Sequence, residues 1–212
     1  MKTSLDPPVV YLITRGLSTA ENFFENRSEV LDIVRTAVRC GVSFVQVREK
    51  MLPADQLFDL VKAAAVLTRG SGTRLMVNDR ADIAAAAGAD GVHLTERSLP
   101  VKLVRATFGS DMLIGVSVHS SGGAETARDG GADLAVFGPV FDTPGKGDPA
   151  GLSQLSNLCK AAAPLPVLAV GGVDGSNLRS VLAAGAAGFA AIRFLNDKNK
   201  LRMLIAEISG RT

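Results

Sequence analysis

The residues best suited to chemistry stand directly after short apolar runs. One group is Gln46-Val47-Arg48-Glu49-Lys50, in which Arg48 and Lys50 alternate with Glu49. In an extended segment the side chains of Arg48 and Lys50 share one face, where both cations could meet one anion. A solvated loop in which these charges pair with Glu49 fits the segment equally well, so the residues alone leave both interpretations open.

A carboxylate and two histidines offer further chemistry. Asp79, in Asn78-Asp79-Arg80, could bind Mg²⁺ or cap the helix expected after it. His119, in Ser117-Val118-His119-Ser120, has the side chain best suited to proton transfer near neutral pH, and a packed structural role is its alternative. His93 fits a structural role better. The absence of an HExxH motif argues against a zinc enzyme.

These residues need a scaffold that brings strand ends together. Short β-branched apolar runs alternate with longer Ala-rich and Leu-rich amphipathic stretches, which is the pattern of βα units around a parallel sheet. The clearest helices are expected at residues 29–39, 54–69, 176–184 and 197–208, and Gly41, Gly70 and Gly185 follow three of them as C-terminal stops. Eight strands are expected at residues 9–14, 44–48, 74–77, 91–94, 113–118, 134–137, 167–170 and 188–192.

One helix-to-strand turn recurs in Gly88-Ala89-Asp90-Gly91, Gly130-Gly131-Ala132-Asp133 and Ala184-Gly185-Ala186-Ala187-Gly188, which supports a βα repeat. Eight units could form a doubly wound open sheet, but the regular spacing and the absence of an early GxGxxG favour closure. One barrel needs roughly 200 to 250 residues. The chain of 212 residues therefore predicts an α/β fold with one domain, a single (β/α)8 TIM barrel over residues 1–212.

In such a barrel the substrate lies over the C-terminal ends of the strands. Gly171 and Gly172 follow the seventh expected strand. Their missing side chains would let backbone N–H groups reach a phosphate, and barrels commonly bind phosphate after strands 7 and 8. A plain tight turn is the alternative, but the position favours a small phosphorylated substrate.

The composition argues against several classes of partner. A net charge of +2 spread along the chain makes no basic stripe, and no Trp with one Tyr leaves little surface for stacking bases, so nucleic acid is not expected. No run approaches the roughly 20 apolar residues that span a bilayer, and residues 1–8 lack a signal peptide's apolar stretch. We expect a cytoplasmic protein without membrane contact. Cys40 and Cys159 are expected to be buried free thiols.

Six segments, taken in order, resemble the thiamin phosphate synthase and TenI superfamily. They are Gln46-x-Arg48-Glu49-Lys50, Asn78-Asp79, Gly91-Val92-His93-Leu94, Gly115-x-Ser117-x-His119, Gly138-Pro139-Val140-Phe141-x-Thr143 and Gly171-Gly172-Val173. The likeness runs from about residue 9 to residue 194, and the ordered set is far more specific than any one motif. It implies a thiamin-biosynthesis enzyme that acts on a thiazole phosphate. Homo-oligomers are common in the superfamily.

The superfamily contains two reactions. Thiamin phosphate synthases join a pyrimidine methyl diphosphate to hydroxyethylthiazole phosphate, with Mg²⁺ and cationic side chains absorbing the charge of the departing diphosphate. TenI-type tautomerases aromatise a thiazole carboxylate phosphate by moving a proton, and need no cofactor. Carried over residue by residue, the synthase pattern implies a Mg²⁺ ligand at Asp79 and diphosphate contacts at Gln46, Arg48, Lys50, Asn78 and Lys146.

Three departures from the synthase pattern resemble the TenI branch. Ser98 stands where synthases carry a second Asp, and a neutral hydroxyl is a far poorer Mg²⁺ ligand. The synthase segment Thr-x-Thr-Lys becomes Thr143-Pro144-Gly145-Lys146, and Ser-Thr-His becomes Ser117-Val118-His119. In TenI proteins this last histidine is proposed to act as acid and base. Arg193 also departs from the usual small residue, and could pair with a substrate anion or point outward.

The leading hypothesis is therefore a TenI-like thiazole tautomerase without a cofactor, in which His119 exchanges the proton. Contacts to the substrate are expected from Ser117, Thr143, Gly171, Gly172 and Arg193. Thiamin phosphate synthase, with Mg²⁺ and a second, pyrimidine diphosphate substrate, is the alternative. A non-catalytic regulator that binds a phosphorylated ligand is the third hypothesis, and a barrel that binds sugar phosphates is a further one.

Overall fold

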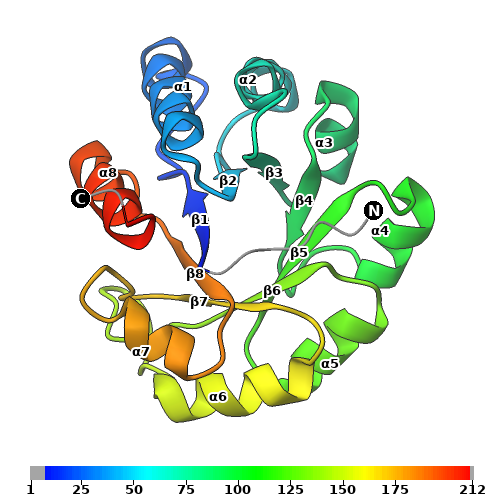
Figure 1. Ribbon diagram of the computed structural model, residues 1–212. Coiled ribbons are helices and arrows are strands. Elements are labelled where there is room, and N and C mark those ends of the chain that lie inside the picture. The colour runs from blue at the N-terminus through cyan, green and yellow to red at the C-terminus, as the bar shows by residue number, and fades with distance from the viewer. Residues whose placement is uncertain (1–7, 211–212) are drawn as a thin grey trace.

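Eight parallel strands close into a barrel in chain order (Figure 1). The computed structural model describes residues 8–210. The strands are β1 (Val9–Ile13), β2 (Phe44–Val47), β3 (Arg74–Asn78), β4 (Gly91–Leu94), β5 (Leu113–Val118), β6 (Leu134–Phe137), β7 (Val167–Val170) and β8 (Gly188–Ala191). β8 pairs with β1, with Val9 opposite Gly188. The predicted TIM barrel is confirmed.

Helices surround the barrel as an outer ring (Figure 1). They are α1 (Phe23–Cys40), α2 (Ala54–Thr68), α3 (Ala81–Ala87), α4 (Val101–Phe108), α5 (Ser121–Asp129), α6 (Gly151–Ala162), α7 (Leu178–Ala183) and α8 (Lys198–Ile208). α1 begins well before the expected residue 29 because Phe23 packs into the outer core. α7 begins after the expected residue 176 because Asp174 and Ser176 form a hydrogen-bonded turn before it.

The apolar core has two layers. Inside the barrel, large side chains such as Tyr11, Phe44 and Met76 fill the lumen, and the Tyr11 and Phe44 rings lie 5.4 Å apart between centroids. Outside it, smaller Val and Ala side chains of the strands pack against the helices. Strands buried on both faces read as continuous apolar runs, which is why their positions could be predicted to within one residue.

The recurring turns make the same contact at the N-terminal end of the barrel. The residue before β4, β6 or β8 donates its N–H to a carbonyl of the preceding strand, at 2.9 Å from Asp90, 2.8 Å from Asp133 and 2.8 Å from Ala187. The two aspartates also bind side chains, because Asp90 pairs with Arg74 at 3.1 Å and Asp133 with Arg105 at 2.6 Å. These turns close the barrel at that end.

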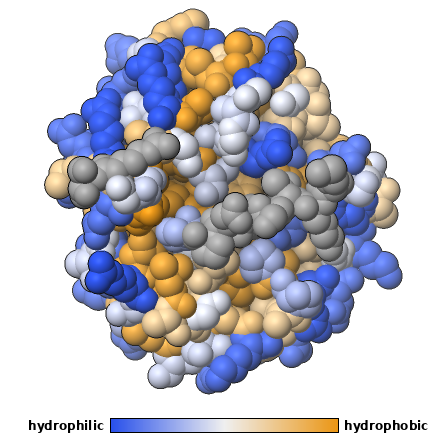
Figure 2. Space-filling view, in the orientation of Figure 1, coloured by the Kyte–Doolittle hydropathy of each residue, from blue (hydrophilic) through white to orange (hydrophobic). Residues whose placement is uncertain are grey.

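Several smaller expectations concern the surface. Within residues 8–210 no helix is both long and apolar enough to cross a bilayer. Figure 2 shows hydrophilic side chains gathered over the peripheral helices. Cys40 and Cys159 are free, as predicted, but each is partly exposed rather than fully buried. Residues 1–7, which carry most of the segment compared with a signal peptide, and residues 211–212 lie outside the described residues.

Candidate active site

Cationic side chains converge at the C-terminal end of the barrel. Burial lowers the pKa of Lys50, and the positive charge of Arg48 lowers it further. Asp79 opposes this shift, whereas Lys146 and Arg97 add to it. These five residues follow β2, β3, β4 and β6 of one closed parallel barrel, so they lie at the same end of it. Among residues 8–210 none of these cations forms an ion pair within 4.0 Å, which leaves them available to an anion.

Glu49 does not neutralise its neighbours Arg48 and Lys50. Its side chain is buried and faces the loop after β1, where one carboxylate oxygen accepts hydrogen bonds from Thr14 Oγ1 (2.6 Å) and the Gly16 N–H (3.1 Å). The interpretation in which the three charges pair with one another is therefore wrong. Sequence reasoning missed this role because a glutamate is ordinarily expected in solvent.

Asp79 directly follows β3 in a left-handed conformation, with φ of 62°, and its N–H donates to the His93 carbonyl at 2.9 Å. The cap of α3 is Arg80, which makes no side-chain capping bond, so the capping interpretation of Asp79 is wrong. The Asp79 carboxylate is exposed beside a cavity of about 230 Å³ that Lys50 and Asn78 also line. A carboxylate among cations is a suitable neighbour for a hydrated cation that bridges to phosphate.

An amide pair lines the wall of the mouth. Gln46, which is buried, donates from Nε2 to Asn78 Oδ1 at 3.2 Å. The Gln46 Oε1 atom is buried and has no hydrogen-bond partner among the described residues. An unsatisfied buried acceptor costs roughly 1–3 kcal/mol, which a ligand that donates a hydrogen bond would recover. The structure therefore brings Gln46, Asn78 and Asp79 together, as the sequence predicts.

The two histidines occupy different surroundings. His93 lies inside the barrel, where burial and, secondarily, the positive charge of Arg48 lower its pKa to about 4. Its ring contacts the hydroxyl groups of Tyr11 and Ser117. His119 directly follows β5 and is exposed, with no hydrogen-bond or ion-pair partner found within residues 8–210. The structure thus gives a fixed orientation to the histidine that the sequence did not select.

The loops after β6 and β7 pack against each other. Phe141 donates its N–H to the Gly171 carbonyl at 3.0 Å, and a Cβ atom on Gly171 would lie 2.6 Å from Pro139 Cα. Gly171 and Gly172 also have positive φ, of 90° and 65°. Close packing and a tight turn therefore require both glycines, whether or not a phosphate binds. Thr143 Oγ1 donates to the Phe141 carbonyl at 2.9 Å.

Backbone donors remain free near these glycines. Within the described chain the N–H groups of Gly172, Val173 and Arg193 have no hydrogen-bond acceptor. Arg193 follows β8 with its side chain exposed and without an ion pair in residues 8–210. Asn196 fixes this last loop, because its Nδ2 donates to the carbonyls of Ile13 and Ile192 at 2.7 Å each.

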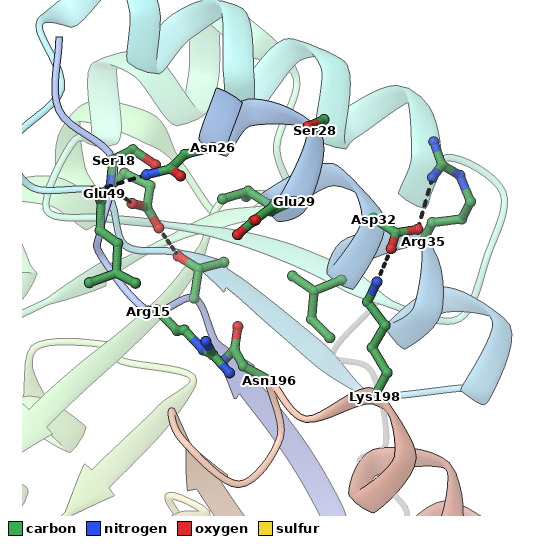
Figure 3. A pocket seen from close by; sticks show the side chains of 14 residues that line it. Arg15, Ser18, Asn26, Ser28, Glu29, Asp32, Arg35, Glu49, Asn196 and Lys198 are labelled. Carbon is green, nitrogen blue, oxygen red and sulfur yellow. Dashed lines mark hydrogen bonds and ion pairs between the residues drawn. The ribbon is translucent and has the colours of Figure 1, made fainter. Parts of the chain in front are cut away.

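The larger cavity, of about 550 Å³, lies beside α1 rather than among these cations (Figure 3). The loop after β1, α1 and the start of α8 form its walls. Asp32, on one wall, pairs with both Arg35 and Lys198. Because Asp32, Arg35 and Lys198 satisfy one another whereas the cations of the mouth do not, we place the candidate site at the mouth of the barrel.

Known proteins match most of this chain. Residues 10–195 match the family described as thiamine monophosphate synthase. A putative thiamine-phosphate synthase of Geobacter sulfurreducens is 46% identical over 191 residues, which cover 87% of this chain and 89% of that protein. A thiamine-phosphate synthase of Roseiflexus sp. is 39% identical over 187 residues, or 87% of this chain and 76% of that protein.

A solved structure shares the architecture. Thiamine phosphate pyrophosphorylase from Pyrococcus furiosus superposes with a TM-score of 0.78 and 29% identity, covering 94% of this chain and 96% of that one. A structure described as native KDPGal aligns with a TM-score of 0.67, but its 18% identity supports the fold alone.

These relatives contradict the leading hypothesis of a thiazole tautomerase. They are named for thiamine-phosphate synthase, so they favour the alternative hypothesis and give no support to the TenI branch. The departures at Ser98 and Val118 leave the cations of the mouth in place, and they carry less weight than identity over most of the chain. The chain belongs to the thiamine monophosphate synthase family.

Proposed function

We propose that this protein is a thiamin phosphate synthase, which joins hydroxymethylpyrimidine diphosphate to hydroxyethylthiazole phosphate and releases diphosphate. The observation that carries the proposal is the gathering of Arg48, Arg97 and Lys146 near Lys50 at the barrel mouth, with Asp79 beside them. Proton transfer on a thiazole does not require such a concentration of positive charge. Departure of a diphosphate does, because negative charge develops on its oxygen atoms as the bond breaks.

In this reaction the bond between the pyrimidine methylene carbon and the diphosphate oxygen breaks, and its electron pair leaves with diphosphate. The thiazole nitrogen then supplies the pair for the new carbon–nitrogen bond. We assign Arg48, Lys50 and Lys146 to the diphosphate, where fixed cations stabilise the departing charge without reorganisation. Repulsion among these cations, which helps to lower the pKa of Lys50, would be relieved when the anion binds.

The residues present fit Mg²⁺ in a site completed by substrate. Asp79 offers an exposed carboxylate, whereas Ser98 Oγ is occupied by hydrogen bonds with the Thr95 N–H (2.7 Å) and Thr95 Oγ1 (3.0 Å). No group of three or more acidic, His or Cys side chains that could hold a metal occurs within residues 8–210. Asp79 would hold the ion together with diphosphate oxygens and water, as is usual for Mg²⁺. When bound, the ion neutralises charge on the leaving group.

The second phosphate has a separate location in this proposal. The free N–H groups of Gly172, Val173 and Arg193, near the ends of β7 and β8, suit the phosphate of the thiazole substrate. The exposed side chain of Arg193, after β8, would add a positive charge for that phosphate. Gln46, Asn78, Ser117 and Thr143 remain for the pyrimidine and the reacting atoms. We assign His119 no role in the coupling reaction, because its predicted acid-base role belongs to the tautomerase hypothesis.

The test is thiamin phosphate formation by the purified protein with both substrates and Mg²⁺, beside a parallel assay of thiazole tautomerisation. We expect coupling, and a large loss of it in Lys50→Ala. Lys160→Ala is the matched control, because Lys160 is exposed in the last turn of α6, at the end of the barrel opposite the mouth. Binding of both substrates without any coupling would contradict the proposal and favour a regulatory protein.

A further inference from the structure

Three polar side chains form a chain of contacts inside the barrel. Tyr11, on β1, places its hydroxyl 3.3 Å from His93 Nδ1, on β4. The opposite ring nitrogen, Nε2, lies 3.0 Å from Ser117 Oγ, on β5. Tyr11 and His93 are buried, whereas Ser117 is partly exposed near the end of its strand. The contacts therefore run from the closed interior of the barrel to its mouth.

The imidazole of His93 has little freedom to turn. Gly115, its partner across β4 and β5, has no side chain, and a Cβ atom there would lie 2.9 Å from His93 Nδ1. The Tyr11 ring also meets the imidazole edge to face, with centroids 5.8 Å apart. The missing side chain of Gly115 makes room for the imidazole, and the contacts with Tyr11 and Ser117 orient it between two hydroxyl groups.

The direction of the hydrogen bonds follows from Tyr11. Its hydroxyl is buried, and His93 Nδ1 is the acceptor that residues 8–210 provide. A buried O–H left without an acceptor costs roughly 1–3 kcal/mol. Tyr11 therefore donates to Nδ1, which must then carry no proton. A neutral imidazole has one N–H, so the proton lies on Nε2 and is donated to Ser117 Oγ.

We propose that Tyr11 and His93 are positioning residues that fix the Ser117 hydroxyl as a hydrogen-bond donor toward the barrel mouth. Since its oxygen accepts from His93, its own proton is free for a substrate atom. That atom must be an acceptor without a proton, either a ring nitrogen or a phosphate oxygen. The substrate part of the inference rests on the proposed synthase function, whereas the tautomer of His93 does not.

The tautomer can be measured without any substrate. The chain has two histidines, so the variant His119→Ala leaves one imidazole for long-range ¹H–¹⁵N correlation spectroscopy. We expect the pattern of a neutral ring protonated at Nε2. In Tyr11→Phe, Nδ1 loses its donor and both tautomers should become populated. A ring protonated at Nδ1 in the presence of Tyr11 would overturn the inference, whatever reaction the protein performs.

The effect on substrate is measured in a double-mutant cycle of Tyr11→Phe and Ser117→Ala in the coupling assay. We expect Tyr11→Phe to lower kcat/KM about 5- to 10-fold when Ser117 is present, which is the value of about one oriented hydrogen bond. In the Ser117→Ala background it should have no further effect. Equal losses in both backgrounds would show that Tyr11 acts only through packing and would contradict the inference.

Two further readouts complete the test. The KM that rises in Tyr11→Phe identifies the substrate that carries the acceptor, because the pyrimidine diphosphate and the thiazole phosphate are varied separately. His93→Gln, which can still donate an amide N–H to Ser117, should retain more activity than His93→Leu at equal folded fraction, measured by thermal unfolding. Equal activity of these two variants would oppose a role for the donated hydrogen bond.

Discussion

The two ends of the barrel carry similar charged residues in opposite states of pairing. At the N-terminal end, Asp133 accepts hydrogen bonds from the Ile114 N–H (2.8 Å) and from Arg105 (2.6 Å). At the C-terminal end, Asp79 and Lys50 form no ion pair among residues 8–210. Charges that satisfy one another stabilise the fold, whereas charges left unpaired are available to a ligand. The same βα unit therefore provides stability at one end and chemistry at the other.

The largest expected effect is on activity at the C-terminal end. Asp79→Asn should lower kcat/KM for coupling about 10³-fold, or roughly 4 kcal/mol, because a neutral amide binds Mg²⁺ much more weakly than a carboxylate does. The free energy of unfolding should stay within about 0.5 kcal/mol, since the carboxylate has no ion-pair partner among residues 8–210 to lose. The control is Asp59→Asn, an exposed position on α2. Steady-state kinetics measure the effect on kcat/KM, and urea unfolding measures the effect on stability. A fall in both kcat/KM and the free energy of unfolding would contradict the assignment of Asp79 to function alone.

Between the two ends, His93 should make stability depend on pH. Its pKa is about 4 in the folded protein and about 6.5 ordinarily. Between these pH values the His93 imidazole is protonated in the unfolded chain but neutral in the folded chain. Stability is therefore complete above about pH 6.5 and falls as pH drops toward 4, by about 3 kcal/mol at 1.36 kcal/mol per pH unit. Urea unfolding at several pH values should show this loss in the wild type and a shallower one in His93→Gln. Identical profiles would contradict the assignment.

At the N-terminal end the expected effect is on stability alone. Asp133→Asn should lower the free energy of unfolding by about 2 kcal/mol, because hydrogen bonds to a charged group are worth roughly 1.5–3 kcal/mol. Coupling kinetics should not change. Asp129→Asn is the comparison, because Asp129 is exposed and its ion pair is with the adjacent Arg128. An effect of Asp133→Asn on kcat/KM at full folding would show that the two ends are coupled.

The sequence predicts this architecture better than it predicts the site. Parallel strands such as β6 and β7 are buried on both faces and appear as continuous apolar runs, so their bounds were predictable. The contact between Tyr11 and His93 joins residues 82 positions apart and exists only once the barrel closes. The branch of the family was predicted wrongly because Ser98 was one of three local departures, while overall identity is spread over the whole chain.

Glu49 lies at the C-terminal end of the barrel, yet its carboxylate is fully hydrogen-bonded. It therefore tests whether pairing, rather than position, decides if a charged residue serves stability or activity. Its second carboxylate oxygen accepts from the Ser18 N–H at 2.9 Å, so the side chain holds the loop after β1. Glu49→Gln should cost about 1.5 kcal/mol, since an amide offers one acceptor where the loop supplies several donors. Hydrogen exchange should quicken at the Gly16 and Ser18 amides, with no more than a few-fold fall in kcat/KM. A loss of activity as large as that of Asp79→Asn, with the loop still protected, would instead place Glu49 among the residues that contact substrate.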